Sequence, residues 1–149
     1  MDTFEAPNAD FENAVKQVLG SMPAAKFLGF EFDTVEPGRV VLRLELRTEL
    51  CEHQGNFQGG VIGALIDFAG GAACGTMLKP GFLLMTLDYS VKLLRPADCN
   101  YLYAEGKVLS NSSLISTAEV MVWKEKPGEA LCATGLVTTR NFAIPQRSK

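Results

Sequence analysis

Hydrophobic and polar residues follow two different periods along the chain, and the changes of period divide it into elements. A spacing of about 3.6 residues between apolar positions is typical of an amphipathic helix, whereas strict alternation is typical of a half-buried strand. Short segments rich in proline, glycine and asparagine separate the late strands, which are therefore expected to pair antiparallel. The pattern predicts helices at 10–20, 24–28 and 59–78, and strands at 30–35, 40–47, 82–95, 101–109, 114–124 and 130–139.

This order of elements predicts an α+β fold, in which one antiparallel sheet wraps around the long central helix. We expect residues 1–149 to form a single domain. Within it, residues 1–22 are interpreted as a helical extension and residues 145–149 as a flexible tail. An open sheet leaves unpaired edge strands, and such edges favour pairing with a second copy of the chain, so a homo-oligomer is expected.

The stretch from Gln58 to Met77 is long, apolar and almost free of charge, with Asp67 as its single carboxylate. Glycines on a helix face allow either tight packing against another element or the close approach of a ligand. Asp67 favours the ligand, because a lone carboxylate in an apolar segment needs partners and such groups concentrate at functional sites. The core-facing side is predicted to carry Ile62, Leu65, Ile66, Ala69 and Ala73, and the bare side Gly60, Gly63, Asp67, Gly70, Gly71 and Cys74.

Charge and composition exclude several classes of function. The net charge of -3 includes no basic block, so nucleic acid is not an expected partner. Four scattered cysteines and one histidine argue against a metal site and for a reducing compartment, so we expect a cytoplasmic protein without a secretory signal. Residues 59–78 are long enough for a membrane span, but the central Asp67 and the glycines argue against membrane insertion.

The segment 52–60, Glu-His-Gln-Gly-Asn-Phe-Gln-Gly-Gly, ends seven residues before Asp67 and resembles the signature of PaaI-like acyl-CoA thioesterases. In that family an Asn and a Gly precede a His-Gly-Gly, and a carboxylate follows in the long helix. The element order over residues 25–140 is similar to the hotdog fold of this family. The resemblance implies that Asp67 is the catalytic carboxylate, that the Gly59 backbone N–H holds the thioester carbonyl, and that Thr86 helps to position the attacking water. It implies an acyl-CoA substrate and no separate cofactor.

Two positions depart from the family pattern. Gln58 stands where the family usually has His, and Glu52 stands where it has Asn or Gln. A Gln amide still donates a hydrogen bond without titrating. A second carboxylate near Asp67 would raise the pKa of one of the two, or act as a base. Alternatively, Asn56 or Gln54 supplies the missing amide, or the departures mark a changed substrate or a lost activity.

The predicted start of the central helix suits the binding of a developing oxyanion. The N–H groups of Gly59 and Gly60 have no intrahelical partner, and the helix dipole adds positive potential there. An ordinary flexible helix start is the alternative. Helical rise separates these donors from Asp67 by roughly 10 Å, too far for one thioester carbon. We therefore expect a composite site, with Gly59 from one subunit and Asp67 from its partner, in a dimer or a dimer of dimers.

Further substrate contacts are expected from the loop before the helix and from its bare side: His53 at the pocket rim, Asn56, Phe57 and Gly63. Two other functions are compatible with a hotdog fold. A non-catalytic protein that binds acyl-CoA or another small molecule is favoured by the departures at residues 52 and 58. A dehydratase or hydratase is disfavoured, because such enzymes rely on the histidine that is missing from the Gln-Gly-Gly motif. The sequence does not indicate which acyl group would be cleaved, nor whether Asp67 attacks directly or activates water.

Overall fold

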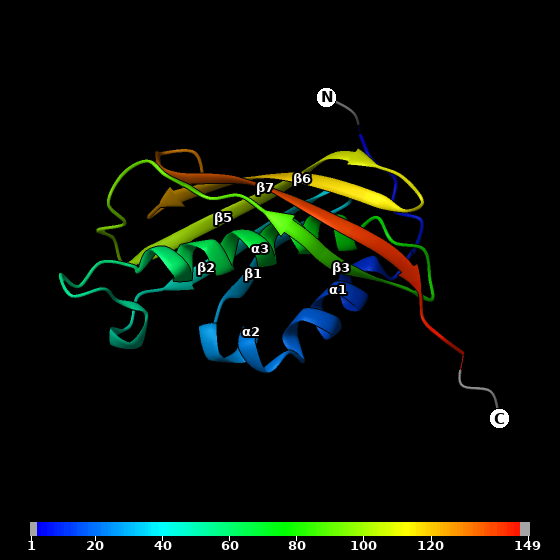
Figure 1. Ribbon diagram of the computed structural model, residues 1–149, viewed down its shortest axis with the longest axis horizontal. Helices are drawn as coiled ribbons and strands as arrows, with labels where there is room; N and C mark the ends of the chain where they lie inside the picture. The colour runs from blue at the N-terminus through cyan, green and yellow to red at the C-terminus, as the bar shows by residue number, and fades with distance from the viewer. Residues whose placement is uncertain (1–2, 147–149) are drawn as a thin grey trace.

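The computed structural model describes residues 3–146, which form helices on one side of a curled sheet (Figure 1). The helical elements are α1 (Phe11–Gly20), α2 (Pro23–Leu28), the short 3-10 helix η1 (Thr48–Leu50) and α3 (Gly59–Gly75). The strands are β1 (Glu31–Glu36), β2 (Arg39–Glu45), β3 (Phe82–Tyr89), β4 (Lys92–Leu93), β5 (Tyr101–Asn111), β6 (Ile115–Lys124) and β7 (Ala130–Ala143).

The strands form one antiparallel sheet in the order β1-β2-β5-β6-β7-β3, and β4 pairs with β7 beside β3. The sheet curls over α3, while α1 and α2 lie on the side of α3 that faces away from the sheet (Figure 1). The predicted fold class is therefore confirmed, because a single antiparallel sheet wraps around one long helix.

The core lies between α3 and the inner face of the sheet. Alternate residues of the central strands are fully buried there, as the half-buried pattern predicts. Gly106 in β5 allows the helix to approach, since a Cβ atom at this position would lie 2.4 Å from the carbonyl oxygen of Ala69. The buried side chains include Val40, Leu42, Leu44, Leu65, Ile66, Leu102, Ala104, Val120 and Val122.

The run from residue 82 to residue 95, predicted as one strand, is divided into β3 and β4. A bulge between Thr86 and Asp88 shifts the register against β7, and the two residues after β3 leave the regular ladder. The carbonyl oxygen of Ser90 then approaches β7 so closely that a Cβ atom at Gly135 would lie only 2.1 Å from it. The glycine in β7 thus permits the chain to cross closely before β4 pairs further along the same strand.

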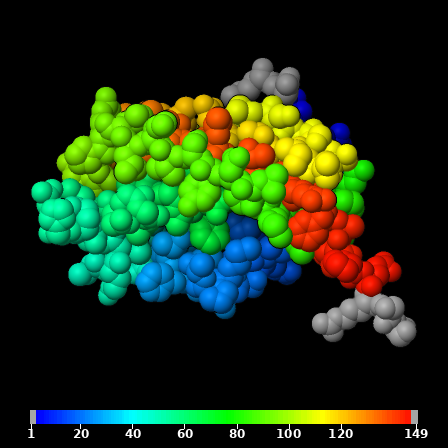
Figure 2. Space-filling view, viewed as in Figure 1, coloured from blue at the N-terminus to red at the C-terminus, as the bar shows by residue number. Residues whose placement is uncertain are grey.

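Strand β3 carries exposed apolar side chains: Met85 and Leu87 are 60% and 53% exposed, whereas Thr86 is half-buried. Tyr89, which follows the bulge, is 47% exposed and lies beside Gly63 of α3. This strand is also one edge of the sheet. On the face shown in Figure 2, the residues of β3 and β4 lie between the end of β7 and the N-terminal helices.

The predicted bare side of α3 is divided in two by the curl of the sheet. A Cβ atom at Gly70 would lie 2.5 Å from a methyl group of Val137, and Cys74 is fully buried. The pattern put these two residues opposite the core-facing side, and this was wrong, because the sheet curls around α3 and packs against both of them. One row of α3 at a spacing of four residues consists of glycines and a single aspartate: Gly59, Gly63, Asp67, Gly71 and Gly75.

The ends of the chain bear on two other expectations. Within the predicted extension 1–22, α1 packs against α3 and β1. Most of the predicted tail 145–149 lies outside the described residues, so that expectation stays a prediction, as does the single-domain boundary. Within residues 3–146, no helix combines the length and apolarity needed to cross a membrane.

Candidate active site

Asp67 and Thr86 are brought together by the packing of α3 on β3. The Thr86 hydroxyl donates a hydrogen bond of 2.8 Å to Oδ1 of Asp67, and both residues are half-buried. No group within residues 3–146 donates a hydrogen bond to the second carboxylate oxygen. The pair therefore presents one fixed and one available carboxylate oxygen on the inner side of an edge strand.

The four-residue row of α3 runs along β3 and β4 in the opposite direction to the strands. A Cβ atom at Gly59 would lie 3.0 Å from Leu93, and one at Gly63 would lie 3.4 Å from Val91. Glycine at these positions lets the chain pass close to the helix. Asp67 is consequently the one residue of this row that extends a side chain toward the strands, where it meets Thr86.

Gln58 acts as the N-cap of α3. Its side-chain oxygen accepts a hydrogen bond of 3.1 Å from the N–H of Val61, and a Cβ atom at Gly60 would lie 2.8 Å from the same oxygen. Within residues 3–146 no acceptor binds the N–H groups of Gly59 and Gly60, which point out of the positive end of the helix. The helix start thus offers two free donors beside a cavity of about 330 Å³, which is lined in part by Phe57, Gly59 and Leu93.

The loop before α3 is held by Glu52. One carboxylate oxygen of Glu52 accepts hydrogen bonds from the backbone N–H groups of Gln54 (3.0 Å) and Asn56 (2.9 Å). The other lies 3.3 Å from Nδ1 of His53, whose side chain is 86% exposed. Phe57 is buried under the loop. No contact joins Glu52, His53 or Asn56 to Asp67 within the described residues, so the structure places these predicted site residues in a separate cluster.

Cys74 lies about two turns beyond Asp67 in α3. Burial raises the pKa of the Cys74 thiol to about 11, so it is neutral near pH 7 and unsuited to act as a nucleophile. Within residues 3–146, no three His, Cys, Asp or Glu side chains are grouped to hold a metal ion.

Two neighbours of the four-residue row were not predicted, namely α1 at its C-terminal end and Leu93 at its N-terminal end. Val15 in α1 lies 3.3 Å from a Cβ atom built at Gly75, and Leu93 covers Gly59. The regular four-residue spacing from Gly59 to Gly75 could have indicated this row, because residues at this spacing lie along one strip of a helix.

Comparison with known proteins assigns the family. Residues 54–131, which contain α3 and both members of the Asp67–Thr86 pair, match the model of the thioesterase superfamily. The chain belongs to the thioesterase superfamily. A "putative esterase" of Halobacterium salinarum is 35% identical over 101 residues, or 64% of this chain and 66% of the relative. The chain thus spans just under two thirds of that relative's length.

Solved structures of the superfamily share the fold. A thioesterase family protein of Silicibacter pomeroyi superposes with a TM-score of 0.85 at 22% identity, covering 90% of this chain and 99% of that one. The PaaI protein of E. coli superposes with a TM-score of 0.81 at 15% identity, covering 93% and 97%. The resemblance to the hotdog fold is therefore confirmed, and the placement of individual site residues remains a prediction.

Proposed function

We propose that this member of the thioesterase superfamily is an acyl-CoA thioesterase in which Asp67 drives hydrolysis of the thioester. The hydrogen bond between Thr86 and Asp67 is the observation that carries the proposal. A hydroxyl donor on one carboxylate oxygen orients the group and leaves the other oxygen to act on the thioester carbonyl, directly or through a water. Coenzyme A leaves as the thiol, so it is part of the substrate.

The start of α3 supplies the complementary charge. The free N–H groups of Gly59 and Gly60 form an oxyanion hole for the carbonyl oxygen, and Gln58 fixes their orientation by capping the helix. A donor of this kind is typically worth a factor of ~10²–10³ in rate. The histidine usual in the family is replaced here by a residue whose side-chain oxygen accepts a backbone hydrogen bond.

The donors and the carboxylate belong to two subunits of a homo-oligomer in this proposal. In one chain they lie two turns apart on α3, which is too far to share a carbonyl group. The edge strand β3 offers a surface for the second copy, because it carries the exposed side chains of Met85 and Leu87 beside an unpaired edge. A two-fold pairing at this edge would supply each Asp67 with the partner subunit's helix start.

Replacement of Asp67 tests the chemistry. We expect Asp67→Asn to lower kcat for acyl-CoA hydrolysis by a factor of at least about 10³, while Thr86 still finds an acceptor and the fold is kept. Release of coenzyme A measures kcat, and circular dichroism reports the fold. Asp33→Asn is the matched control, since Asp33 is an exposed β1 carboxylate that also pairs with a threonine. Retained turnover in Asp67→Asn would remove this carboxylate from the mechanism.

Mixed subunits extend the same experiment to the composite site. Gly59→Pro removes one oxyanion donor at the first helical position, where proline is tolerated, and the extended backbone of Gln58 suits a following proline. If Gly59 and Asp67 of different subunits meet, random reassociation of Asp67→Asn with Gly59→Pro leaves one intact site in each mixed dimer. About a quarter of wild-type turnover should then return. No return would show that both groups act within one chain.

A non-catalytic acyl-CoA-binding protein is the second candidate, favoured by the engagement of Gln58 in capping α3. It predicts saturable binding of acyl-CoA without release of coenzyme A. Release of coenzyme A from acyl-CoA by the wild type would exclude the non-catalytic function.

A further inference from the structure

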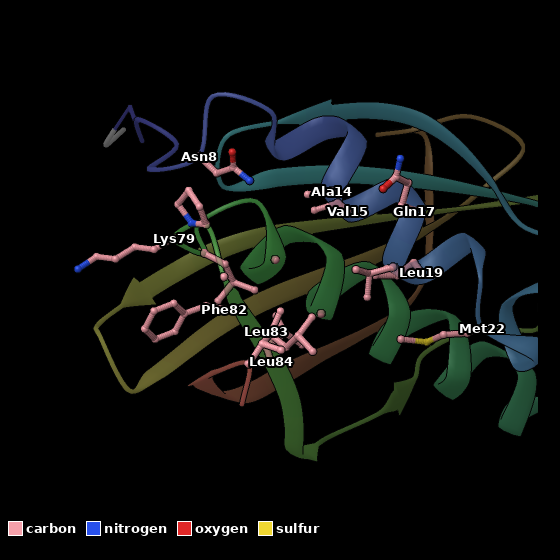
Figure 3. Close-up of a pocket in the computed structure, with 17 residues that line it drawn as sticks. Asn8, Ala14, Val15, Gln17, Leu19, Met22, Lys79, Phe82, Leu83 and Leu84 are labelled. Carbon is pink, nitrogen blue, oxygen red and sulfur yellow. The ribbon is translucent and has the colours of Figure 1, made fainter. Parts of the chain in front are cut away.

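A second cavity, of about 270 Å³, lies beside the C-terminal half of α3. One wall comes from α1, the floor from Gly71 and Gly75 of α3, and the other wall from the start of β3. In Figure 3, Val15 and Leu19 of α1 lie across the cavity from Leu83 and Leu84 of β3. The N-terminal helix therefore closes a space that the sheet and α3 alone would leave open to solvent.

Gly71 keeps this cavity open. A Cβ atom at Gly71 would meet no atom within 4 Å, although the residue is buried. At Gly70, one position away, a Cβ atom would lie 2.5 Å from Val137. Close packing thus explains the glycine at position 70 and leaves the one at position 71 unexplained. The unfilled volume at Gly71 belongs to the cavity.

The residues that line the cavity adjoin the proposed catalytic pair on both elements. Gly71 is one helical turn beyond Asp67 on the same strip of α3. Leu84, which also lines the cavity, is two residues before Thr86 and therefore shares its face of β3. A group that entered past the carboxylate would continue along Gly71 and Gly75 between the helix and the strand.

The lining suits a flexible hydrocarbon. Most of the residues around the cavity are apolar, and the one charged residue among them, Lys79, extends its side chain away from the cavity in Figure 3. An apolar cavity of ~150 Å³ stays dry and accepts a benzene molecule, so 270 Å³ has room for roughly ten carbon atoms. The floor follows one strip of the helix from Gly71 to Gly75, and an elongated space of this kind fits a chain better than a ring.

We propose that this cavity binds the acyl chain of a straight-chain thioester substrate, that α1 is the outer wall of the chain site, and that Gly71 sets the longest chain admitted. The proposal rests on the proposed thioesterase function, which it deepens by naming the substrate class. Each methylene that leaves water for the cavity should raise kcat/KM about fourfold, up to a chain of about ten carbons.

A chain-length series tests the proposal. The wild type, Gly71→Ala and Gly71→Leu are assayed against straight-chain acyl-CoA esters from butanoyl to tetradecanoyl, and against phenylacetyl-CoA. A leucine at position 71 adds four carbon atoms and fills the space of about four methylenes, so kcat/KM for decanoyl-CoA should fall on the order of 200-fold while that for butanoyl-CoA stays within about twofold. The alanine variant should show a smaller loss in the same direction. Gly20→Leu is the matched control, because Gly20 ends α1 outside the cavity and its Cβ would contact nothing.

Calorimetric binding of decanoate to the same proteins separates failure of this inference from failure of the proposed function. A wild type that hydrolyses no thioester, yet binds decanoate and loses that binding in Gly71→Leu, would refute the thioesterase and support the chain site. Unchanged chain-length preference and unchanged decanoate binding in folded Gly71→Leu and Gly71→Ala would overturn the inference. A preference for phenylacetyl-CoA over every straight chain would also overturn it, since it would assign the cavity to a ring.

Discussion

Gly70 and Gly71 are neighbours in α3, yet they face two regions of opposite character. Gly70 faces the sheet, where a Cβ atom would meet Val137 at 2.5 Å and Val120 at 3.2 Å. Gly71 faces the space between α1 and β3, where a Cβ atom would meet nothing. The same residue type thus allows close packing on one side of the helix and maintains a cavity on the other.

The contrast extends along the whole helix. On the sheet side, Gly106 and Gly70 let backbone and side chains interlock, and the residues there are fully buried. Where α3 faces the edge strand β3 and α1 lie the half-buried Asp67–Thr86 pair and the cavity. The central strands therefore determine where α3 lies, and the side toward β3 and α1 is free to carry chemistry. Substitutions by alanine distinguish the two regions, because the added methyl group is the same everywhere.

Gly106→Ala should have the largest effect of these substitutions. Its methyl group would lie 2.4 Å from the carbonyl oxygen of Ala69, and a helix backbone cannot move aside as a side chain can. We expect the free energy of unfolding to fall by about 3 kcal/mol or more, at the upper end of overpacking effects. Urea denaturation measures the loss, with Gly20→Ala as a control in open space. A loss below that of Gly70→Ala would show that α3 shifts easily on the sheet.

Gly70→Ala should destabilise the protein less. The clash is with Val137, which is fully buried and surrounded by the sheet, so it has little room to rotate. We expect a net loss of about 1–2 kcal/mol, because overpacking costs 1–3 and alanine is the better helix former. Removing the obstructing methyl groups in Gly70→Ala/Val137→Ala should recover part of the loss in a double-mutant cycle. Strict additivity of the two changes would contradict the packing argument.

The sequence was sufficient for the fold because its two periods are local and strong. The alternation in β5, β6 and β7 and the apolar run of α3 each predicted an element within a few residues of its observed bounds. The division between β3 and β4 was not predictable, since it depends on the approach of Ser90 to Gly135 from a distant strand. Long-range contacts of this kind leave no period in the sequence.

The candidate site was predictable only in part, for a related reason. Asp67 and the glycines of the helix start are conspicuous in an apolar segment, and the resemblance to a family indicated Thr86. Spacing alone did not predict that Gly70 packs against the sheet and Gly71 faces a cavity. Which residues of α3 the sheet covers depends on how far the sheet curls. Nor did it indicate that α1 would form the wall of a cavity over Gly75, since that wall is assembled by tertiary packing.

Gly71→Ala should have the smallest effect on stability and the opposite sign. A glycine inside a helix is less favourable than alanine by up to ~1 kcal/mol, and here the added methyl group meets no neighbour, so the free energy of unfolding should rise by about 0.5–1 kcal/mol. The midpoints of urea denaturation for Gly71→Ala and Gly70→Ala should therefore shift in opposite directions from that of the wild type. A destabilised Gly71→Ala would mean that the cavity closes on the glycine in solution, and the two sides of α3 would then be alike. A stabilised variant would show that glycine is retained at position 71 against the preference of the helix, as expected where a substrate needs the space.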